Sequence, residues 1–257
     1  MAGRFSRSAR YLIRPISYWR SLEFRLVWEH GDFQSSNRVL DIGSPKPFCL
    51  YLAESVGAEV HATDIEPYFI NEYTALRDGR GISPERLRIE AADGRSLPYP
   101  DGYFDRVYSV SVLEHIPGAG DSDCVREIGR VLAAGGICLI TVPFWPEGHD
   151  VYRDASKFYW SGSSASSDEG KVFYQRRYDE EDLKRRLIEP SGLRVERLLY
   201  VGERVLTRRK GEIGDLLPPI TGLIDPLLSR VAHSRPVTDW RDLAKPLCAF
   251  LKLVKLA

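Results

Sequence analysis

Short apolar runs and longer segments with helical spacing alternate through the first half of the chain. The short runs predict five strands, at residues 38–42, 58–64, 87–92, 104–111 and 137–142. Helices are predicted between several of them, over residues 48–56, 67–77 and 123–132, with Gly135-Gly136 ending the last one. Strand and helix thus alternate through about a hundred residues, which is the pattern of a parallel sheet with helices on both faces.

The second half of the chain is less regular. Residues 179–187 predict a helix, because the acids at its start complement the positive end of a helix dipole. Gly192 ends that helix, and residues 193–201 predict a sixth strand. A last apolar run fits either a strand or an amphipathic helix over residues 243–256, whose lysines would reach a membrane surface.

Residues 1–36 combine arginines with many aromatic and aliphatic residues. From Tyr18 to His30 the spacing predicts an amphipathic helix. Two functions suit it: a lid over an active site, or a basic surface for peripheral contact with an anionic membrane. The simpler alternative is a helix that packs its aromatic stripe on the domain and leaves its arginines in solvent.

Composition restricts the class of protein. Apolar residues make up 43% of the chain and aromatic residues 11%, which is enough for a buried core. Lys plus Arg and Asp plus Glu number 36 each, so no net charge draws the chain to nucleic acid. The four cysteines lack the paired spacing of zinc or redox sites and are expected to be reduced thiols. Without a membrane span or a signal peptide, a cytoplasmic protein is expected.

Acidic residues stand near the ends of three predicted strands. The first strand contains Asp41 and stops at Gly43, as in strand–turn–helix units whose backbone N–H groups face a nucleotide ligand. Asp64 ends the second strand, where a carboxylate can accept hydrogen bonds from both hydroxyls of a ribose. Asp93-Gly94 follows the third strand, where the acid could accept a hydrogen bond from the amine of an adenine ring.

Six short motifs follow one another in a characteristic order and spacing. They are Leu-Asp-Ile-Gly at 40–43, Asp64, Ala-Asp at 92–93 before Leu-Pro at 97–98, Phe-Asp at 104–105, Ser-Val-Leu-Glu-His-Ile at 111–116 and Arg-Val-Leu-x-x-Gly-Gly at 130–136. With these motifs the chain resembles the class I S-adenosylmethionine-dependent methyltransferases of the methyltransferase-11 type. The resemblance covers roughly residues 38–143 and continues more weakly to about residue 203.

The resemblance implies an α/β fold with a Rossmann-like, seven-stranded, mostly parallel sheet, helices on both faces and an antiparallel last strand. That last strand is expected at residues 247–254. The methyltransferase domain would cover residues 37–257, after a helical extension over residues 1–36. Residues 207–240 would form a largely helical insertion before the last strand.

The resemblance also implies S-adenosylmethionine as the cofactor, with no metal. Asp41, Gly43 and Ser44 would lie near the methionine half of the cofactor, and Asp64 would hold its ribose. Asp93 and Gly94 would flank the adenine, and Ser111 and Val112 would line the sulfonium. Ile65 is a further cofactor-binding candidate. Two of the acids have structural alternatives, Asp41 as a cap of its turn and Asp93 as a turn former before glycine.

The first turn departs from the family pattern. Glycines normally alternate there, whereas this chain has Pro45 and Pro47 in two of those places. Each proline removes a backbone N–H that could bind the ligand, although Pro47 also suits the first turn of a helix. One alternative is therefore a protein of this fold that has lost turnover and serves as a binding partner. A nicotinamide-dependent oxidoreductase is disfavoured, because the turn lacks the three glycines that crowd a pyrophosphate.

The acceptor side of the reaction is expected in the segments after the fourth and fifth strands. Methyl transfer requires alignment of the acceptor and exclusion of water, and needs a base only for a hydroxyl or a protonated amine. His115 and His149 are candidates for that base, each with an alternative as a hydrogen-bonded structural residue. Residues 144–178 mix aromatic residues with arginines, as an acceptor lid or as a cluster that covers the sheet edge. The expected acceptor is an oxygen of a small molecule, a sugar or a lipid-linked intermediate.

Overall fold

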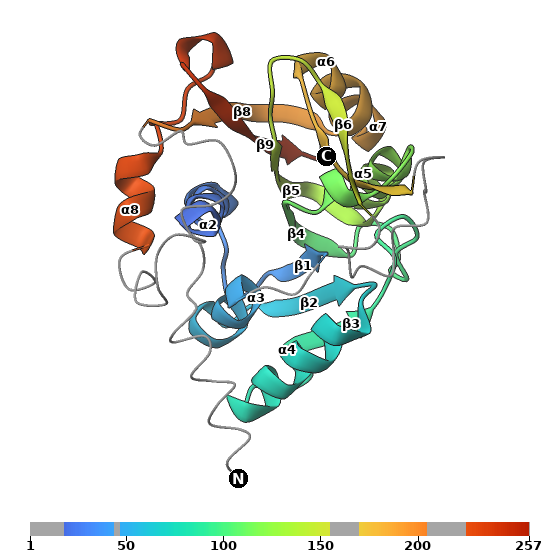
Figure 1. The fold of residues 1–257 in the computed structure, drawn as a ribbon. Coiled ribbons are helices and arrows are strands. Elements are labelled where there is room, and N and C mark those ends of the chain that lie inside the picture. The colour runs from blue at the N-terminus through green and yellow to red at the C-terminus, as the bar shows by residue number, and fades with distance from the viewer. Residues whose placement is uncertain (1–17, 44–46, 155–169, 205–224, 257) are drawn as a thin grey trace.

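A central sheet of seven strands organises the computed structural model, which describes residues 18–43, 47–154, 170–204 and 225–256 (Figure 1). In spatial order the strands are β3 (Leu87–Ala91), β2 (Glu59–Asp64), β1 (Arg38–Ile42), β4 (Phe104–Val110), β5 (Leu132–Pro143), β9 (Pro246–Val254) and β8 (Arg194–Gly202). The strands from β3 to β5 are parallel, and β9 runs antiparallel to both of its neighbours. The predicted Rossmann-like sheet and its last strand are therefore confirmed. The alternative of a C-terminal amphipathic helix is wrong, because this apolar run is buried between two other strands.

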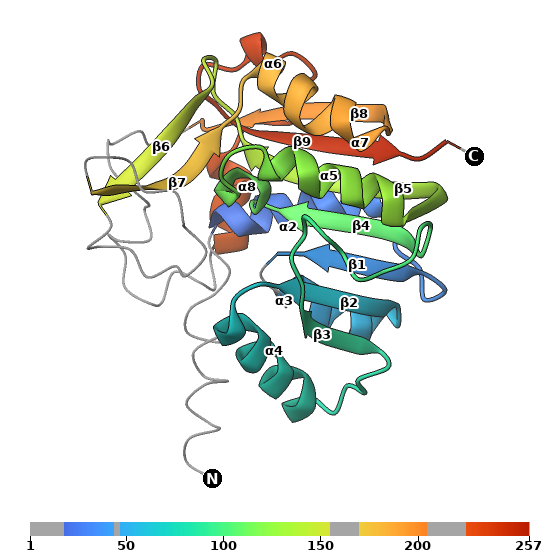
Figure 2. The same cartoon turned by 90° about the vertical axis from the view of Figure 1, so that its right-hand side faces the viewer.

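Helices cover both faces of the sheet (Figure 2). They are α2 (Tyr18–Gly31), α3 (Pro47–Tyr51) with a wider helical turn at Leu52–Val56, α4 (Pro67–Gly79), α5 (Gly120–Val131), α6 (Glu180–Asp182) with a wider turn at Leu183–Ile188, α7 (Glu189–Ser191) and α8 (Asp225–Ala232). The helices α2, α3 and α4 bury Leu26, Phe48 and Tyr73 in one core. The helix α5 buries Val125 and Ile128 in a second core on the other face. None of the helices in the described ranges is both long enough and apolar enough to cross a membrane.

The predicted end of α5 is confirmed within one residue, since the helix ends at Val131, but β5 begins at Leu132 and not at residue 137. Gly135-Gly136 therefore lie within the strand and do not end the helix. The Lys255 ammonium group donates hydrogen bonds to the carbonyl oxygens of Gly129 and Leu132, both at 2.8 Å. Carbonyl groups in the last turn of a helix have no partner within the helix, and a lysine from a distant segment satisfies them here.

Residues 144–178 are not a loop throughout. They contain β6 (His149–Asp154) and β7 (Lys171–Arg177), which pair with each other in an antiparallel hairpin. Figure 2 shows this hairpin on the side of the sheet toward which β1 and β4 point. The serine-rich part of the predicted lid, residues 161–167, lies outside the described residues.

The predicted insertion 207–240 is described only from residue 225 onward. Its helix there is α8, which packs against α2. The following residues are extended rather than helical, and Val237 forms a β-bridge with Tyr200 of β8. Of the described part of this insertion, residues 225–232 are helical, and its residues 207–224 lie outside the described residues.

Candidate functional site

The carboxyl ends of β1 and β2 place two acids at the same edge of the sheet. Asp41 is 1% exposed and Asp64 is 6% exposed. The parallel register sets Asp41 beside Ala62, and the Thr63 hydroxyl donates to the Asp41 carbonyl oxygen at 3.1 Å. The Asp64 carboxylate accepts a hydrogen bond from the Glu66 backbone N–H at 2.8 Å. Two buried carboxylates thus lie where adjacent parallel strands end, the usual position of a ligand site in such sheets.

The sheet order reverses between β1 and β4, and Gly43 lies at this switch point. Its φ is +94°, and a Cβ built on it would lie 2.3 Å from Cγ2 of Val112, the residue that follows Ser111 after β4. Only glycine fits this position, because a side chain would meet Val112 and the backbone conformation is one that other residues rarely adopt. The fold therefore places two of the predicted cofactor residues, Gly43 and Val112, in contact with each other. Ser44 lies outside the described residues.

The turn after β3 holds Asp93 in a local ion pair. The Arg95 guanidinium donates from Nε to Oδ1 and Oδ2 of Asp93, each at 3.0 Å, and the Arg95 backbone N–H donates to Oδ1 at 2.9 Å. Hydrogen bonds from Arg95 lower the pKa of Asp93 below its ordinary value. A Cβ on Gly94 would lie 2.8 Å from Cys124 Sγ on α5, so this glycine allows the turn to pack closely. Ile65, after β2, is 50% exposed at the same edge of the sheet.

Ser111 is held by a residue that the sequence did not single out. Its φ is +49°, and its hydroxyl donates to Glu23 Oε1 on α2. The Thr141 hydroxyl of β5 donates to the same oxygen at 3.0 Å, and Arg20 Nη1 donates to Glu23 Oε2 at 2.7 Å. Glu23 is wholly buried, so one carboxylate joins α2 to the ends of β4 and β5. The Ser111 hydroxyl is engaged with this carboxylate in the structure.

A signal for Glu23 was present in the sequence. Leu22, Leu26 and Val27 of α2 are buried, and Glu23 stands among them on the face of the helix that packs against the sheet. A charged residue within an apolar stripe must find a partner, and Arg20 lies one turn earlier. The prediction that this helix packs on the domain is confirmed, although Arg20 is not left in solvent.

The two candidate bases differ in their surroundings. His115 lies in the 3₁₀ turn Leu113–His115, and its ring nitrogen Nδ1 lies 2.7 Å from the Tyr174 carbonyl oxygen of β7. A carbonyl oxygen only accepts, so Nδ1 carries a proton and the neutral ring has Nε2 as its basic atom. His149 begins β6, is exposed, and places Nδ1 at 3.0 Å from the Glu147 carbonyl oxygen. The structure thus fixes His115 between the sheet edge and the hairpin, and leaves His149 at the surface.

Another buried carboxylate, that of Asp121, anchors the hairpin of β6 and β7. Asp121 in the first turn of α5 is wholly buried and accepts from Arg176 Nη1 at 2.7 Å, from Arg186 Nη2 at 2.8 Å and from the Tyr178 hydroxyl at 2.9 Å. Burial, with Asp121 beside it, raises the pKa of Tyr178 well above its ordinary value, so the phenol stays protonated and donates. These contacts join β7 and the helical turn after α6 to α5.

Other arginines of the hairpin are engaged with aromatic rings. The Arg153 guanidinium lies 3.4 Å from the centroid of the Tyr174 ring, and that of Arg177 lies 4.5 Å from the centroid of a ring of Trp145. Cation–π contacts of this kind stabilise the arrangement of neighbouring side chains. The described part of the predicted lid therefore has an internal order of its own.

The strand order defines a Rossmann-like fold, and Asp41 and Asp64 lie near the switch point at which such folds bind their ligands. The family described as a methyltransferase domain matches residues 40–140. Over these residues, which are less than half of the chain, it is similar to methyltransferase domains, as its motifs indicated, and its fold is that of solved S-adenosylmethionine-dependent methyltransferases.

The relatives agree with this assignment. Methyltransferase GfsG of Streptomyces halstedii is 34% identical over 116 residues, which are 43% of this chain and 39% of that protein. A probable chloroplastic tocopherol O-methyltransferase of Oryza sativa subsp. japonica is 32% identical over 140 residues, 54% of this chain and 37% of that protein. Both matches therefore cover well under half of the relative. Among solved structures, the [4+2]-cyclase SpnF has a TM-score of 0.59 at 20% identity, over 93% of this chain and 82% of that one, and shows the fold.

Proposed function

We propose that this protein binds S-adenosylmethionine at the carboxyl ends of β1, β2 and β4 and transfers the methyl group to an oxygen of a small-molecule, sugar or lipid-linked acceptor. One observation carries the proposal: Gly43, at positive φ where the sheet order reverses, packs closely against Val112 after β4. Buried Asp41 and Asp64 lie at the adjacent strand ends. Ligands of open α/β sheets bind at such a switch point.

Carboxylates at this edge suit the hydroxyl groups of the cofactor. The proposed cofactor residues are Asp41, Gly43, Ser44, Asp64, Ile65, Asp93, Gly94, Ser111 and Val112. Asp64 is an acceptor-only carboxylate at the end of β2, which suits the paired hydroxyls of a ribose. The bound cofactor supplies a methyl group on a good leaving group, so the protein's task is to orient the acceptor and exclude water.

His115 is the stronger of the two candidates for a base. Its Nδ1 hydrogen bond to the Tyr174 carbonyl oxygen holds the ring, and Nε2, 3.8 Å from Glu114 Oε1, would be the atom that takes a proton from an acceptor hydroxyl. Tyr174 belongs to the hairpin, so the same contact ties the proposed acceptor lid to the base. His149 remains a second candidate, in an exposed position at the start of β6.

The proposal is tested with cofactor carrying a labelled methyl group and a panel of sugars, phenols and lipid carriers. We expect label in an oxygen-bearing acceptor. His115→Gln should then lower kcat by about two orders of magnitude, the usual contribution of a general base, with less effect on cofactor affinity. His149→Gln is the matched control and should lower kcat less. Label transfer that His115→Gln leaves unchanged would remove His115 from the mechanism.

A second candidate function is cofactor-fold binding without methyl transfer. A solved structure of this fold is a [4+2]-cyclase, so the fold alone does not imply methyl transfer. The two functions separate in one experiment. Tight binding of S-adenosylmethionine with no label transferred to any member of the panel would favour the binding protein.

A further inference from the structure

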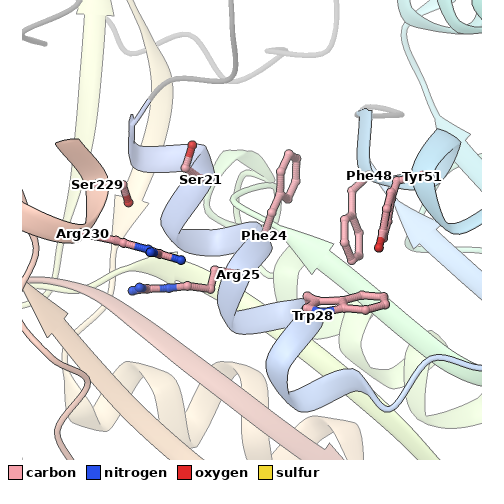
Figure 3. Close-up of a pocket in the computed structure, with 8 residues that line it drawn as sticks. All are labelled: Ser21, Phe24, Arg25, Trp28, Phe48, Tyr51, Ser229 and Arg230. Carbon is pink, nitrogen blue, oxygen red and sulfur yellow. The ribbon is translucent and has the colours of Figure 1, made fainter. Parts of the chain in front are cut away.

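A cavity of about 350 Å³ lies between α2, α3 and α8 (Figure 3). Its lining residues are Ser21, Phe24, Arg25, Trp28, Phe48, Tyr51, Ser229 and Arg230. None of them is among the proposed cofactor residues or the candidate bases. The proposed methyl transfer therefore does not account for this cavity.

Four aromatic rings form one side of the cavity. The Phe24 and Phe48 rings stack with their centroids 5.4 Å apart, and Trp28 meets Tyr51 edge to face at 5.3 Å. Trp28 is 42% exposed and Tyr51 is 44% exposed. Large aromatic side chains in a concave, partly open site gain free energy when an apolar group covers them. This side of the cavity suits an aliphatic chain or a ring.

Two guanidinium groups form the opposite side. Arg25 extends from α2 and Arg230 from α8, and Figure 3 shows the two side chains pointing toward each other. Within the described ranges, no carboxylate pairs with either of them, and Arg25 Nε is buried without a hydrogen-bond partner. Two like charges that share one cavity repel each other, and an anion between them would remove that cost.

We propose that this cavity binds an amphipathic anion, that is, a phosphate or carboxylate group carried on an apolar chain or ring. The anionic group would lie between Arg25 and Arg230, and the apolar part would cover Trp28 and Tyr51. The volume is near the lower end of the range for small-molecule sites, so it fits a short ligand or one end of a longer one. This site is independent of the cofactor and of methyl transfer.

The test is calorimetry on the full chain with three probes. Dodecyl phosphate, kept below its micelle concentration, carries both the charge and the chain. Dodecyl maltoside carries the chain without the charge, and inorganic phosphate carries the charge without the chain. We expect dodecyl phosphate to bind at least about tenfold more tightly than either of the others, because each of them lacks one half of the recognition. Equal affinity for dodecyl maltoside would overturn the proposal.

Substitutions locate the binding. Arg25→Gln and Arg230→Gln should each weaken binding of dodecyl phosphate about tenfold, and Trp28→Ala several-fold. Arg88→Gln, an exposed arginine on β3, is the matched control and should bind as the unmodified chain does. The arginine variants should keep the unmodified unfolding temperature, since neither side chain has a described ion pair. Unchanged affinity in the double variant Arg25→Gln with Arg230→Gln would also overturn the proposal.

Vesicles then distinguish the source of the ligand. If phosphatidylglycerol vesicles sediment the protein, phosphatidylcholine vesicles do not, and the double arginine variant stays in solution, the anion is a lipid headgroup. If dodecyl phosphate binds and neither kind of vesicle does, the ligand is a free amphipathic anion. Either result supports the cavity as an anion site.

Discussion

The proposed cofactor edge and the elements packed around it are held together by different contacts. These elements are α2, α5 and the hairpin of β6 and β7, and we call them the cover. At the edge, two acidic side chains make polar contacts that are local along the chain: Asp64 accepts from Glu66, and Asp93 pairs with Arg95. Such contacts form as soon as the turn forms, and they cost little to build. The edge is therefore largely a product of short segments and of parallel strand register.

The cover depends on two buried carboxylates with distant partners. Glu23 joins α2 to Ser111 and Thr141, which lie 88 and 118 residues away in the chain. Asp121 joins α5 to Arg176 and Arg186, which lie 55 and 65 residues away. Each carboxylate organises several donors, so its loss leaves buried donors unpaired. The cover should therefore be more sensitive than the edge to single polar substitutions.

The largest effect is expected at Asp121. Asp121→Asn should lower the free energy of unfolding by about 3 kcal/mol, because Arg176 and Arg186 would keep their charges with no buried carboxylate between them. Urea denaturation measures this change. Asp123→Asn on the same helix is the control; its pair with Arg126 is exposed, so the loss should stay below about 1 kcal/mol. Equal effects of the two variants would show that the Asp121 cluster does not anchor the cover.

Glu23 should give the next largest effect. Glu23→Gln keeps the shape but removes the charge that Arg20 pairs with, and should cost about 2 kcal/mol of stability. It should also weaken S-adenosylmethionine binding, because it loosens Ser111 next to Val112. Glu29→Gln, exposed on the same helix, should change neither quantity. Weakened stability with unchanged cofactor affinity would restrict Glu23 to a structural role.

A glycine pair separates the edge from the rest of the fold. Gly43→Ala and Gly81→Ala both place a side chain at positive φ, which costs about 1 kcal/mol each. A Cβ meets Val112 at Gly43 and nothing within 4 Å at Gly81. We expect only Gly43→Ala to reduce cofactor affinity strongly, as measured by calorimetry. Similar affinities in the two variants would place the cofactor away from the switch point.

The smallest effect concerns pH. The pair with Arg95 lowers the pKa of Asp93, so its stabilisation is present above the ordinary aspartate pKa and is lost as pH falls through the lowered value. The pair is half exposed, so Asp93→Asn should cost no more than about 1 kcal/mol near pH 7. As the pH falls through the lowered pKa of Asp93, the difference from the unmodified chain should shrink in urea denaturation. A difference that persists unchanged in acid would mean that another contact of Asp93 is responsible.

The sequence predicted the edge better than the cover, for a physical reason. Alternating apolar runs fix the strands, and an acid or glycine at a strand end marks the turn, so β1 to β4 were placed within about two residues. The C-terminal strand β9 needed the family architecture, since a strand buried on both faces has no alternating pattern. The start of β5 was placed five residues too late, because Leu132 joins the sheet by pairing with Phe104 across a register shift that a local pattern does not show.

In the candidate site, too, residues with local sequence patterns were predicted and residues with distant partners were not. Asp41, Gly43 and Asp64 were identified from local patterns and lie at one edge of the sheet. Glu23 and Asp121 were not identified as site residues, because their partners come from segments that only the folded chain brings together.

The most direct test is calorimetric titration of the chain with S-adenosylmethionine and S-adenosylhomocysteine, alongside Asp64→Ala. We expect one site per chain for both ligands, and at least about tenfold weaker binding in the variant, because a carboxylate that accepts ribose hydroxyls contributes a charge-assisted hydrogen bond. Asp78→Ala, exposed on α4, is the matched control and should bind as the unmodified chain does. No heat at millimolar ligand, or unchanged affinity in Asp64→Ala, would contradict a cofactor site at the ends of β1 and β2.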